Sequence, residues 1–226
     1  MQRDLAQVDL SDVALFPLPE VLLLPHGMLP LHLFEQRYRD MMEDVLAREE
    51  KPVMAMASLA PGWKQNYMGK PDIHRVVCVG VVSRYERLDD GRFNLVLGGA
   101  IRANILKEIS GKSYRRAVLE PIVDIAASQD CLLRSRLRLR SLCIHSALRR
   151  QTAASRELLH IIDNHCIEVP MLLDILLHAL SEDSALKQLI LAEADLTRRL
   201  SIGIDALEAS YPPVHPAHHN SVASLN

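Results

Sequence analysis

The first half of the chain alternates short apolar runs with turn-forming residues. The runs Ala14–Pro17, Val21–Leu24 and Pro30–Phe34 are separated by proline and glycine. Runs this short cannot form a helix of several turns, and they are typical of strands joined by tight turns. We therefore expect an N-terminal half that is rich in β-structure.

One helix is expected within this half, over Glu35–Arg48. Its apolar residues recur at the spacing of one helical face. They are Tyr38, Met41, Met42, Val45 and Leu46. Strand-like composition returns at Val53–Leu59.

The clearest β-pattern lies between His74 and Gly99. Val76–Val82 is rich in β-branched residues, and Phe93–Leu97 has the composition of a second strand. Between them, Asp89–Gly91 has the sequence of a hairpin turn, because glycine tolerates a positive φ and aspartate nearly does. The pattern predicts a β-hairpin here.

Two more strands are predicted, at Arg102–Ile109 and Tyr114–Ile122, with Ser110–Lys112 as the turn between them. Pro121 ends the β-region because it cannot donate a hydrogen bond to a ladder. The result is about six to eight strands without the alternating helices of a parallel sheet. This order predicts an antiparallel barrel or sandwich.

After Ala126 the apolar spacing becomes helical. Ser128 is predicted to cap a helix that runs to about Arg150, and Glu157–Cys166 is a further candidate helix. The second half is therefore expected to be a bundle of four or five helices.

Three more helix starts are predicted in the bundle. Pro170 suits the first turn of a helix that ends near Leu180, because its missing N–H costs little there. Ser181 is expected to cap the next helix and Asp195 the last one. The fold class is thus α+β, with an antiparallel β-barrel or sandwich that holds one helix, followed by a helical bundle.

Composition and charge exclude several classes of protein. The 226 residues are 49% hydrophobic and 24% charged, an ordinary globular balance, and the net charge of -2 speaks against a general nucleic-acid binder. The N-terminus has no basic segment followed by an apolar run, and nowhere do about 18 apolar residues follow one another. We expect a cytoplasmic protein with no membrane span and no nucleic-acid partner. The four scattered cysteines fit reduced thiols better than a disulfide framework.

No motif for catalysis or for a cofactor is recognisable. Gly111-Lys112-Ser113 resembles part of a phosphate-binding loop, but Leu106 stands where the first glycine is needed and a strand is expected to follow. The histidines lack the cysteine pairs that are typical of zinc sites. A Gly-x-Ser-x-Gly sequence is absent, so no nucleophile elbow is indicated. We expect no catalytic residue, cofactor or metal.

An arginine-rich segment spans Leu132–Gln151, with six arginines and no acidic residue. On a helix, Arg134 and Arg138 fall on one strip. This strip is either a solvated face that pairs with the acids of Glu157, Glu168 and Asp174, or a docking surface for an acidic partner.

A loop of unusual composition contains the only tryptophan. Trp63, Tyr67 and Met68 lie between two glycines in a chain with only 4% aromatic residues. Tryptophan and tyrosine are frequent anchors at interfaces. Trp63 is therefore either a binding residue or a cover for an open end of the barrel.

The opening residues carry a family resemblance. Ala14–Leu18 (ALFPL) and Val21–Tyr38 (VLLLPHGMLPLHLFEQRY) resemble the start of the Lon protease N-terminal, substrate-binding domain. Gly80, Gly99 and Arg102 stand where that family has its glycines and arginine, and the helical half resembles the end of the same domain. His26 and Gln36 depart from the family pattern.

The resemblance implies a pseudo-barrel followed by a helical bundle, and a function in protein binding. The ATPase and Ser-Lys protease domains of the full-length proteases have no counterpart here, so we expect no enzyme activity. The expected partners are unfolded or exposed apolar protein segments, with a protease or a chaperone as a further candidate. The expected binding residues are Met28, Phe34, Trp63, Tyr67, Met68, Arg134 and Arg138.

Two alternatives to the binding module stay open. One is a hydrolytic or small-molecule-binding enzyme with a cleft between the two halves. The other is a structural protein or homo-oligomer that uses the arginine-rich helix. The predicted organisation is a flexible N-terminus (1–12), a barrel (13–125), a bundle (126–210) and a disordered tail (211–226).

Overall fold

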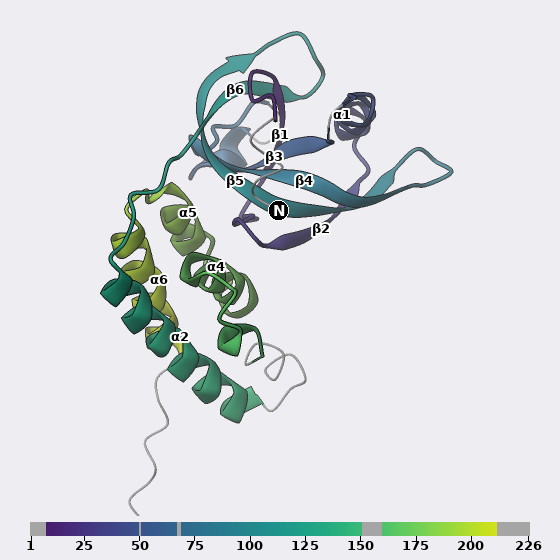
Figure 1. The fold of residues 1–226 in the computed structure, drawn as a ribbon. Coiled ribbons are helices and arrows are strands. Elements are labelled where there is room, and N and C mark those ends of the chain that lie inside the picture. Colours follow the sequence, from purple (N-terminus) through teal and green to yellow (C-terminus); the bar gives the residue numbers. More distant parts are fainter. Residues whose placement is uncertain (1–7, 50, 67–68, 151–159, 212–226) are drawn as a thin grey trace, which may run out of the picture.

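The computed structural model describes residues 8–49, 51–66, 69–150 and 160–211, and it has two halves (Figure 1). The first half contains six strands, the helix α1 (Gln36–Leu46) and the 3-10 helix η2 (Trp63–Asn66). The strands are β1 (Val13–Leu18), β2 (Met28–Leu33), β3 (Val53–Ser58), β4 (Val76–Arg87), β5 (Phe93–Ile109) and β6 (Arg115–Pro121). The second half contains α2 (Gln129–Arg150), α4 (Val169–Leu180), α5 (Ser184–Ala192) and α6 (Leu196–Ser210).

The six strands form a sheet that closes into a ring, as expected for a pseudo-barrel. Their order is β2-β5-β4-β3-β1-β6, and a pairing between β5 and β6 closes the ring. One pair departs from the antiparallel prediction, because β1 runs parallel to β3. The connection between them passes through β2 and α1, and a crossover of this kind is what a parallel pair requires.

The predicted turns of the barrel are confirmed. Gly91 has a φ of 79° and Gly111 a φ of 103°, so each occupies a left-handed position that favours glycine. The two strands predicted at Phe93–Leu97 and Arg102–Ile109 are instead one strand, β5. Its first part pairs with β2 and its later part with β6, so β5 connects the two terminal strands of the sheet order.

The predicted strand at Val21–Leu24 is wrong. This segment pairs with no strand, yet Leu22, Leu23 and Leu24 are buried. It folds back on itself through a hydrogen bond from the Gly27 N–H to the Leu24 carbonyl. The apolar run therefore fills the core as an irregular segment.

The helical half confirms two of the predicted caps and corrects one. The Ser128 hydroxyl accepts a hydrogen bond from the Cys131 N–H, and Asp195 accepts from the N–H groups of Thr197 and Arg198. Ser181 does not begin α5. It ends α4, and Asp183 caps α5 by accepting from the Leu186 N–H.

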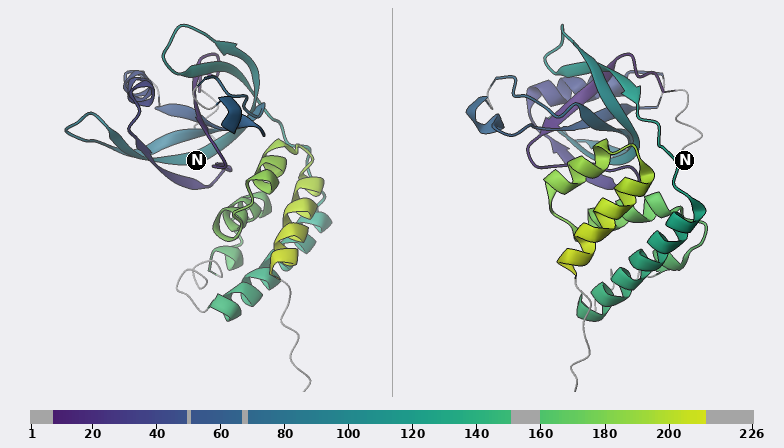
Figure 2. Two further views of the ribbon diagram at one scale, coloured as in Figure 1. Left: turned by 180° about the vertical axis from the view of Figure 1, so that it is seen from behind. Right: turned by 90° about the vertical axis from the view of Figure 1, so that its left-hand side faces the viewer.

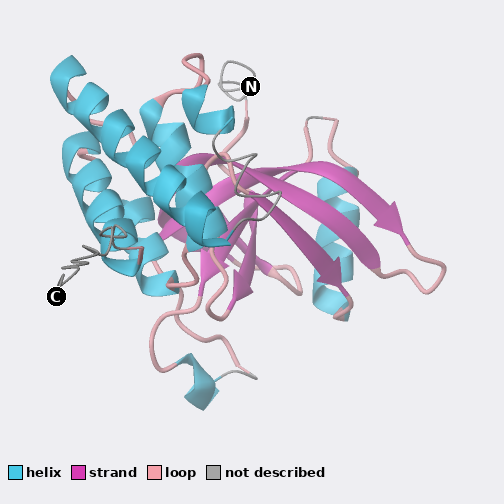
Figure 3. Ribbon diagram, turned by 90° about the horizontal axis from the view of Figure 1, so that it is seen from below, coloured by secondary structure: helices cyan, strands magenta, loops and turns pink. Residues whose placement is uncertain are grey.

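The predicted helix at Glu157–Cys166 lies partly outside the described residues, and residues 160–163 are helical. Figure 2 shows the C-terminal helices packed together at one end of the barrel, and Figure 3 shows the strands between them and α1. None of the helices in the described ranges is long and apolar enough to cross a membrane.

Two hydrophobic clusters stabilise the fold. One is formed by side chains of β1, β3, β4, β5 and β6, including Leu15, Val79 and Ile105. The other runs from α1 and the buried segment after β1 into the bundle, where it includes Leu173 and Leu200. The second cluster contains residues of both halves, so the two halves share one hydrophobic core.

Candidate functional site

An apolar groove of about 360 Å³ lies between β1, β2 and the start of α1. Apolar side chains dominate its walls, and a histidine and a glutamate are the polar residues among them. The lining residues are Phe16, Leu18, Val21, Leu29, Pro30, Leu31, His32, Phe34, Glu35 and Tyr38.

Phe34 is an exposed aromatic residue of this groove. It lies between β2 and α1, 62% of the residue is exposed, and its ring stacks on His32 with 6.1 Å between centroids. Beneath it, Phe16 and Tyr38 make an edge-to-face contact at 4.6 Å. A large exposed aromatic beside an apolar hollow is a feature of protein-binding surfaces.

A second hollow, of about 300 Å³, adjoins the groove and shares Leu18, Glu35 and Tyr38 with it. It is more polar, but its charges are paired: Arg37 with Glu35 at 2.8 Å, and both Lys70 and Arg115 with Glu108. Burial would raise the pKa of Glu108, but the hydrogen bonds from Arg115 and Lys70 hold the pKa below its usual value. This hollow therefore offers ion pairs and little excess charge.

The structure distributes the residues predicted for binding over three places. Met28 begins β2 and is 50% exposed, and Phe34 lies in the groove that follows. Trp63 is in η2, at a separate hollow. Tyr67 and Met68 lie outside the described residues.

Arg134 and Arg138 lie on α2 and are paired within the bundle. Arg134 pairs with Asp130 at 2.5 Å, and Arg138 pairs with Asp205 and Glu208 at 2.7 and 2.6 Å. The acids predicted for this face were different ones. Asp174, for example, is buried and pairs with His26.

The hollow beside Trp63 lies between the barrel and α5 and measures about 280 Å³. Ser58, His74 and Ser184 line it, the residue types that a hydrolase would use. In the described part of the chain, however, no hydrogen bond joins the His74 ring to either serine. Nor do the described residues contain a group of three histidine, cysteine or acidic side chains that could hold a metal ion.

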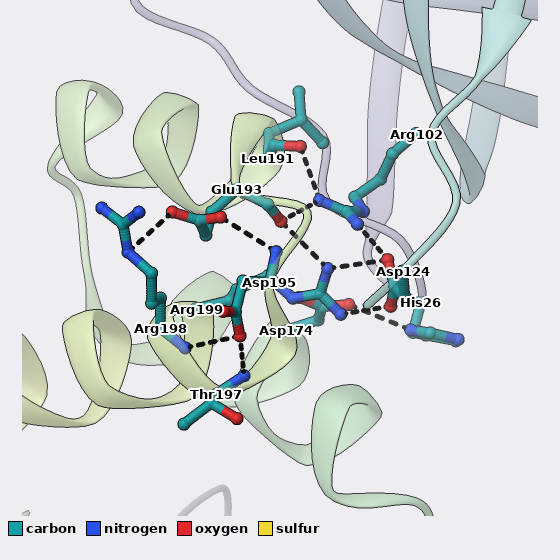
Figure 4. Close-up of polar contacts among 10 residues, drawn as sticks. All are labelled: His26, Arg102, Asp124, Asp174, Leu191, Glu193, Asp195, Thr197, Arg198 and Arg199. Carbon is teal, nitrogen blue, oxygen red and sulfur yellow. Dashed lines mark hydrogen bonds and ion pairs between the residues drawn. The ribbon is translucent and has the colours of Figure 1, made fainter. Parts of the chain in front are cut away.

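A polar network joins the two halves at the end of α5 (Figure 4). Arg102 of β5 and Arg199 of α6, only 7% and 4% exposed, both bind the carboxylate of Asp124. Arg102 also donates to the carbonyls of Leu191 and Glu193 at 2.9 and 2.6 Å, at the end of α5. Helix ends leave such carbonyls without partners, so Arg102 acts as a side-chain cap from the other half.

The charges of this network shift the pKa of its members. Burial would raise the pKa of Asp124, but the hydrogen bond from Arg199 and the charge of Arg102 lower it overall. Burial also lowers the pKa of Arg102, helped by the charge of Arg199. The carboxylate is therefore the form of Asp124 that the junction stabilises.

Asp174 lies near the network and is itself buried in α4. Its carboxylate faces His26 Nδ1 at 3.2 Å, and His26 has the unusual φ of 64°. Burial raises the pKa of Asp174, although His26 and the nearby arginines oppose that shift. No local sequence signal indicates this pair, because His26 and Asp174 are 148 residues apart.

We predict that Asp174→Asn makes the protein more stable relative to the parent as the pH rises. A carboxyl with a raised pKa adds stability below its ordinary value of about 4, and this stability is lost as the pH rises through the folded-state pKa. The asparagine variant does not titrate and avoids this loss, and its amide still bonds to His26. Urea unfolding of both proteins between pH 4 and 8 measures the difference.

Asp205→Asn is the matched control, with the opposite sign. Its hydrogen bond from Arg138 lowers the pKa of Asp205, so the parent gains stability from this group above pH 4 and loses it as the pH falls. The control variant should therefore be the less stable one at neutral pH. A flat difference between Asp174→Asn and the parent over the whole range would contradict the assignment.

The comparison with known proteins agrees with the architecture. The model of the ATP-dependent protease La (Lon) substrate-binding domain matches residues 12–209. The chain therefore belongs to the Lon substrate-binding domain family, as its opening residues indicated. No other domain is detected, and a search of curated proteins finds no match.

Two solved structures have the same fold. The N-terminal domain of Lon protease from the Mycobacterium avium complex is 18% identical, with a TM-score of 0.69 over 88% of this chain and 98% of that one. A Lon N-terminal domain protein from Xanthomonas campestris is 19% identical, with a TM-score of 0.59 over 89% and 99%. At this identity the likeness concerns the fold.

Proposed function

We propose that the protein is a non-catalytic binding module for unfolded or exposed apolar protein segments. The observation that carries the proposal is the apolar groove with the exposed Phe34 at its rim. Membership of a family named for substrate binding supports it. A protease or a chaperone that receives the bound segments is the partner of this proposal.

The apolar composition of the groove decides the class of ligand. Burying apolar surface is the main favourable term in most protein association, and a client with exposed apolar residues provides the complementary surface. Charged ligands are expected to bind weakly here, because the cations of the adjoining hollow already form ion pairs with Glu35, Glu108 and Asp44. The exposed segments of an unfolded protein therefore fit the groove best.

Phe34→Ser tests the proposal. Loss of one buried aromatic contact is worth about 1.5–3 kcal/mol, so we expect binding to weaken about tenfold or more. The measurement is the fluorescence anisotropy of a labelled ten-residue peptide that alternates leucine with serine between terminal lysines. A permanently unfolded, carboxymethylated protein serves as a second ligand.

The matched control is Leu106→Ser. Leu106 lies at the bulge of β5 that faces β6, is 53% exposed, and is not among the residues of the groove. It should leave the affinity unchanged. Failure of the parent protein to bind either ligand, or equal affinity of the Phe34 variant and the control, would reject the groove as a binding site.

An enzyme at the hollow beside Trp63 is the second candidate function. The co-location of Ser58, Ser184 and His74 favours it, but their side chains do not form the hydrogen-bonded chain that activates a nucleophile. Binding without turnover is therefore our proposal.

A further inference from the structure

The sheet has an open border at β2. In the strand order, β2 stands at one end and pairs with β5 alone, through Met28↔Gly98 to Leu33↔Phe93. The ring closes elsewhere, where residues of β5 from Ala103 onward pair with β6. Among the described residues, the second side of β2 therefore has no neighbouring strand (Figure 1).

The contact with α4 shows which backbone groups face this open side. The His178 ring donates from Nε2 to the Met28 carbonyl at 3.1 Å, so this carbonyl points away from β5. In an antiparallel pair the backbone groups of alternate residues point the same way. The Pro30 carbonyl and the N–H and carbonyl of His32 consequently face the open side as well.

Pro30 agrees with this assignment. Proline has no N–H, and within sheets it is confined to positions where the N–H would face away from the ladder. In the described part of the chain, no backbone or side-chain hydrogen bond outside the ladder reaches the Pro30 carbonyl or the His32 backbone. Three backbone groups at this border thus have no partner from the chain.

The apolar groove runs along the same border. Leu29, Pro30, Leu31 and His32 of β2 form one of its walls, and Phe16, Leu18 and Val21 contribute to the rest. A strand placed there would bring one set of alternate side chains into the hollow of about 360 Å³. Natural edge strands are usually protected by lysine, proline or a covering element. Within the described ranges, this border has Pro30 and the contact of His178 with Met28 as its protection.

We propose that an extended apolar segment of an unfolded protein binds by adding a strand to β2. Its backbone pairs with the N–H and carbonyl of His32 and donates to the Pro30 carbonyl, and its alternate side chains enter the groove next to Phe34. Backbone bonds do not depend on sequence, so this mode selects for an extended conformation and for apolar residues at every second position. The inference rests on the proposed function and specifies its binding mode.

Two variants at His32 separate the backbone from the side chain. His32→Pro removes the N–H that faces the groove, at a position with the same orientation as Pro30, and His32→Ala keeps this N–H. Both variants lose the contact of His32 Nδ1 with Asn94 at 2.7 Å and the stacking on Phe34, so the comparison isolates one donor. We expect His32→Pro to bind the labelled leucine-serine peptide about tenfold more weakly than His32→Ala.

A second measurement uses the unmodified protein and does not depend on how the proline variant folds. N-methylation removes one backbone donor from the peptide. We expect methylation to weaken binding about tenfold at every second residue of the peptide, where the N–H faces β2. Methylation of the intervening residues should have little effect. The His32 amide should also exchange its hydrogen more slowly when the peptide is bound.

The outcomes distinguish the binding mode from the function. Equal affinity of both His32 variants, together with equal effects of methylation at both sets of residues, overturns strand addition while the proposed function stands. If the peptide and the unfolded protein both fail to bind the parent protein, the proposed function fails and the binding mode fails with it. Binding that depends on which set of residues is methylated, with a protected His32 amide, supports the inference.

Discussion

Replacing Asp124 with alanine is expected to lower the free energy of unfolding by about 2–3 kcal/mol, because its carboxylate binds two buried arginines although it is itself 41% exposed. The reason lies in the two arginines that this carboxylate binds. Arg102 and Arg199 are buried, and without Asp124 their hydrogen-bond partners in the described part of the chain would be backbone carbonyls, with Asp174 as the nearby acidic group. An unpaired buried charge is far more costly than an exposed one. Urea unfolding followed by far-UV circular dichroism measures the loss.

Asp130→Ala is the control for this prediction. Asp130 also binds an arginine, Arg134, but both side chains are about 70% exposed (69% and 71%). Exposed pairs contribute little, so we expect a loss below about 1 kcal/mol. Similar losses in the two variants would show that the junction is not held by buried charge.

In the Asp124 variant, replacing Arg102 with methionine should restore part of the stability, because it removes one uncompensated charge.

Local chemistry explains which parts of the fold could be predicted from the sequence. The hairpin at Asp89–Gly91 depends on a glycine with positive φ. The cap of α6 depends on the Asp195 side chain, which accepts a hydrogen bond from an N–H group in the first turn of the same helix. Such signals lie within a few residues. The parallel pairing of β1 with β3 depends on how the chain crosses over, and no short segment encodes that.

Errors in the prediction have physical causes of the same kind. Val21–Leu24 is apolar enough for a strand, but a run of four such residues does not reveal its backbone conformation. Ser181 and Asp183 are both good cap residues, and only the end of α4 decides between them. β5 passes through Gly98 and Gly99 without interruption because β4 pairs with it before, at and after these two glycines.

The candidate site could be predicted only in part. Met28 and Phe34 belong to the opening segment that the family resemblance implies as part of the binding surface, and the structure places them in β2 and at the groove beside it. The polar junction was not foreseen, because Arg199 is 75 residues away from Asp124. The open border of β2 is likewise a property of the whole sheet, since it depends on which strands close the ring.

Gly99→Ala is the second substitution for which we expect a large effect, a loss of about 3 kcal/mol in the free energy of unfolding. A Cβ at this position would lie 2.1 Å from the Leu24 carbonyl oxygen. The obstacle is backbone, and it is held in place because Gly99 bonds to His26 and Gly27 at 3.0 and 2.8 Å. The irregular segment after β1 can pack against β5 only where β5 has no side chain.

Gly98→Ala is the natural control, because it changes the neighbouring residue of the same strand. A Cβ there would meet the Met28 sulfur at 3.3 Å, the end of a flexible side chain that can move. We expect a change within about 1 kcal/mol, and alanine even favours a strand over glycine. If both variants lost the same stability, the close approach of Leu24 would not be the reason for Gly99. If only the Gly99 variant lost stability, the requirement for glycine at this position would be explained by the close approach of the Leu24 carbonyl.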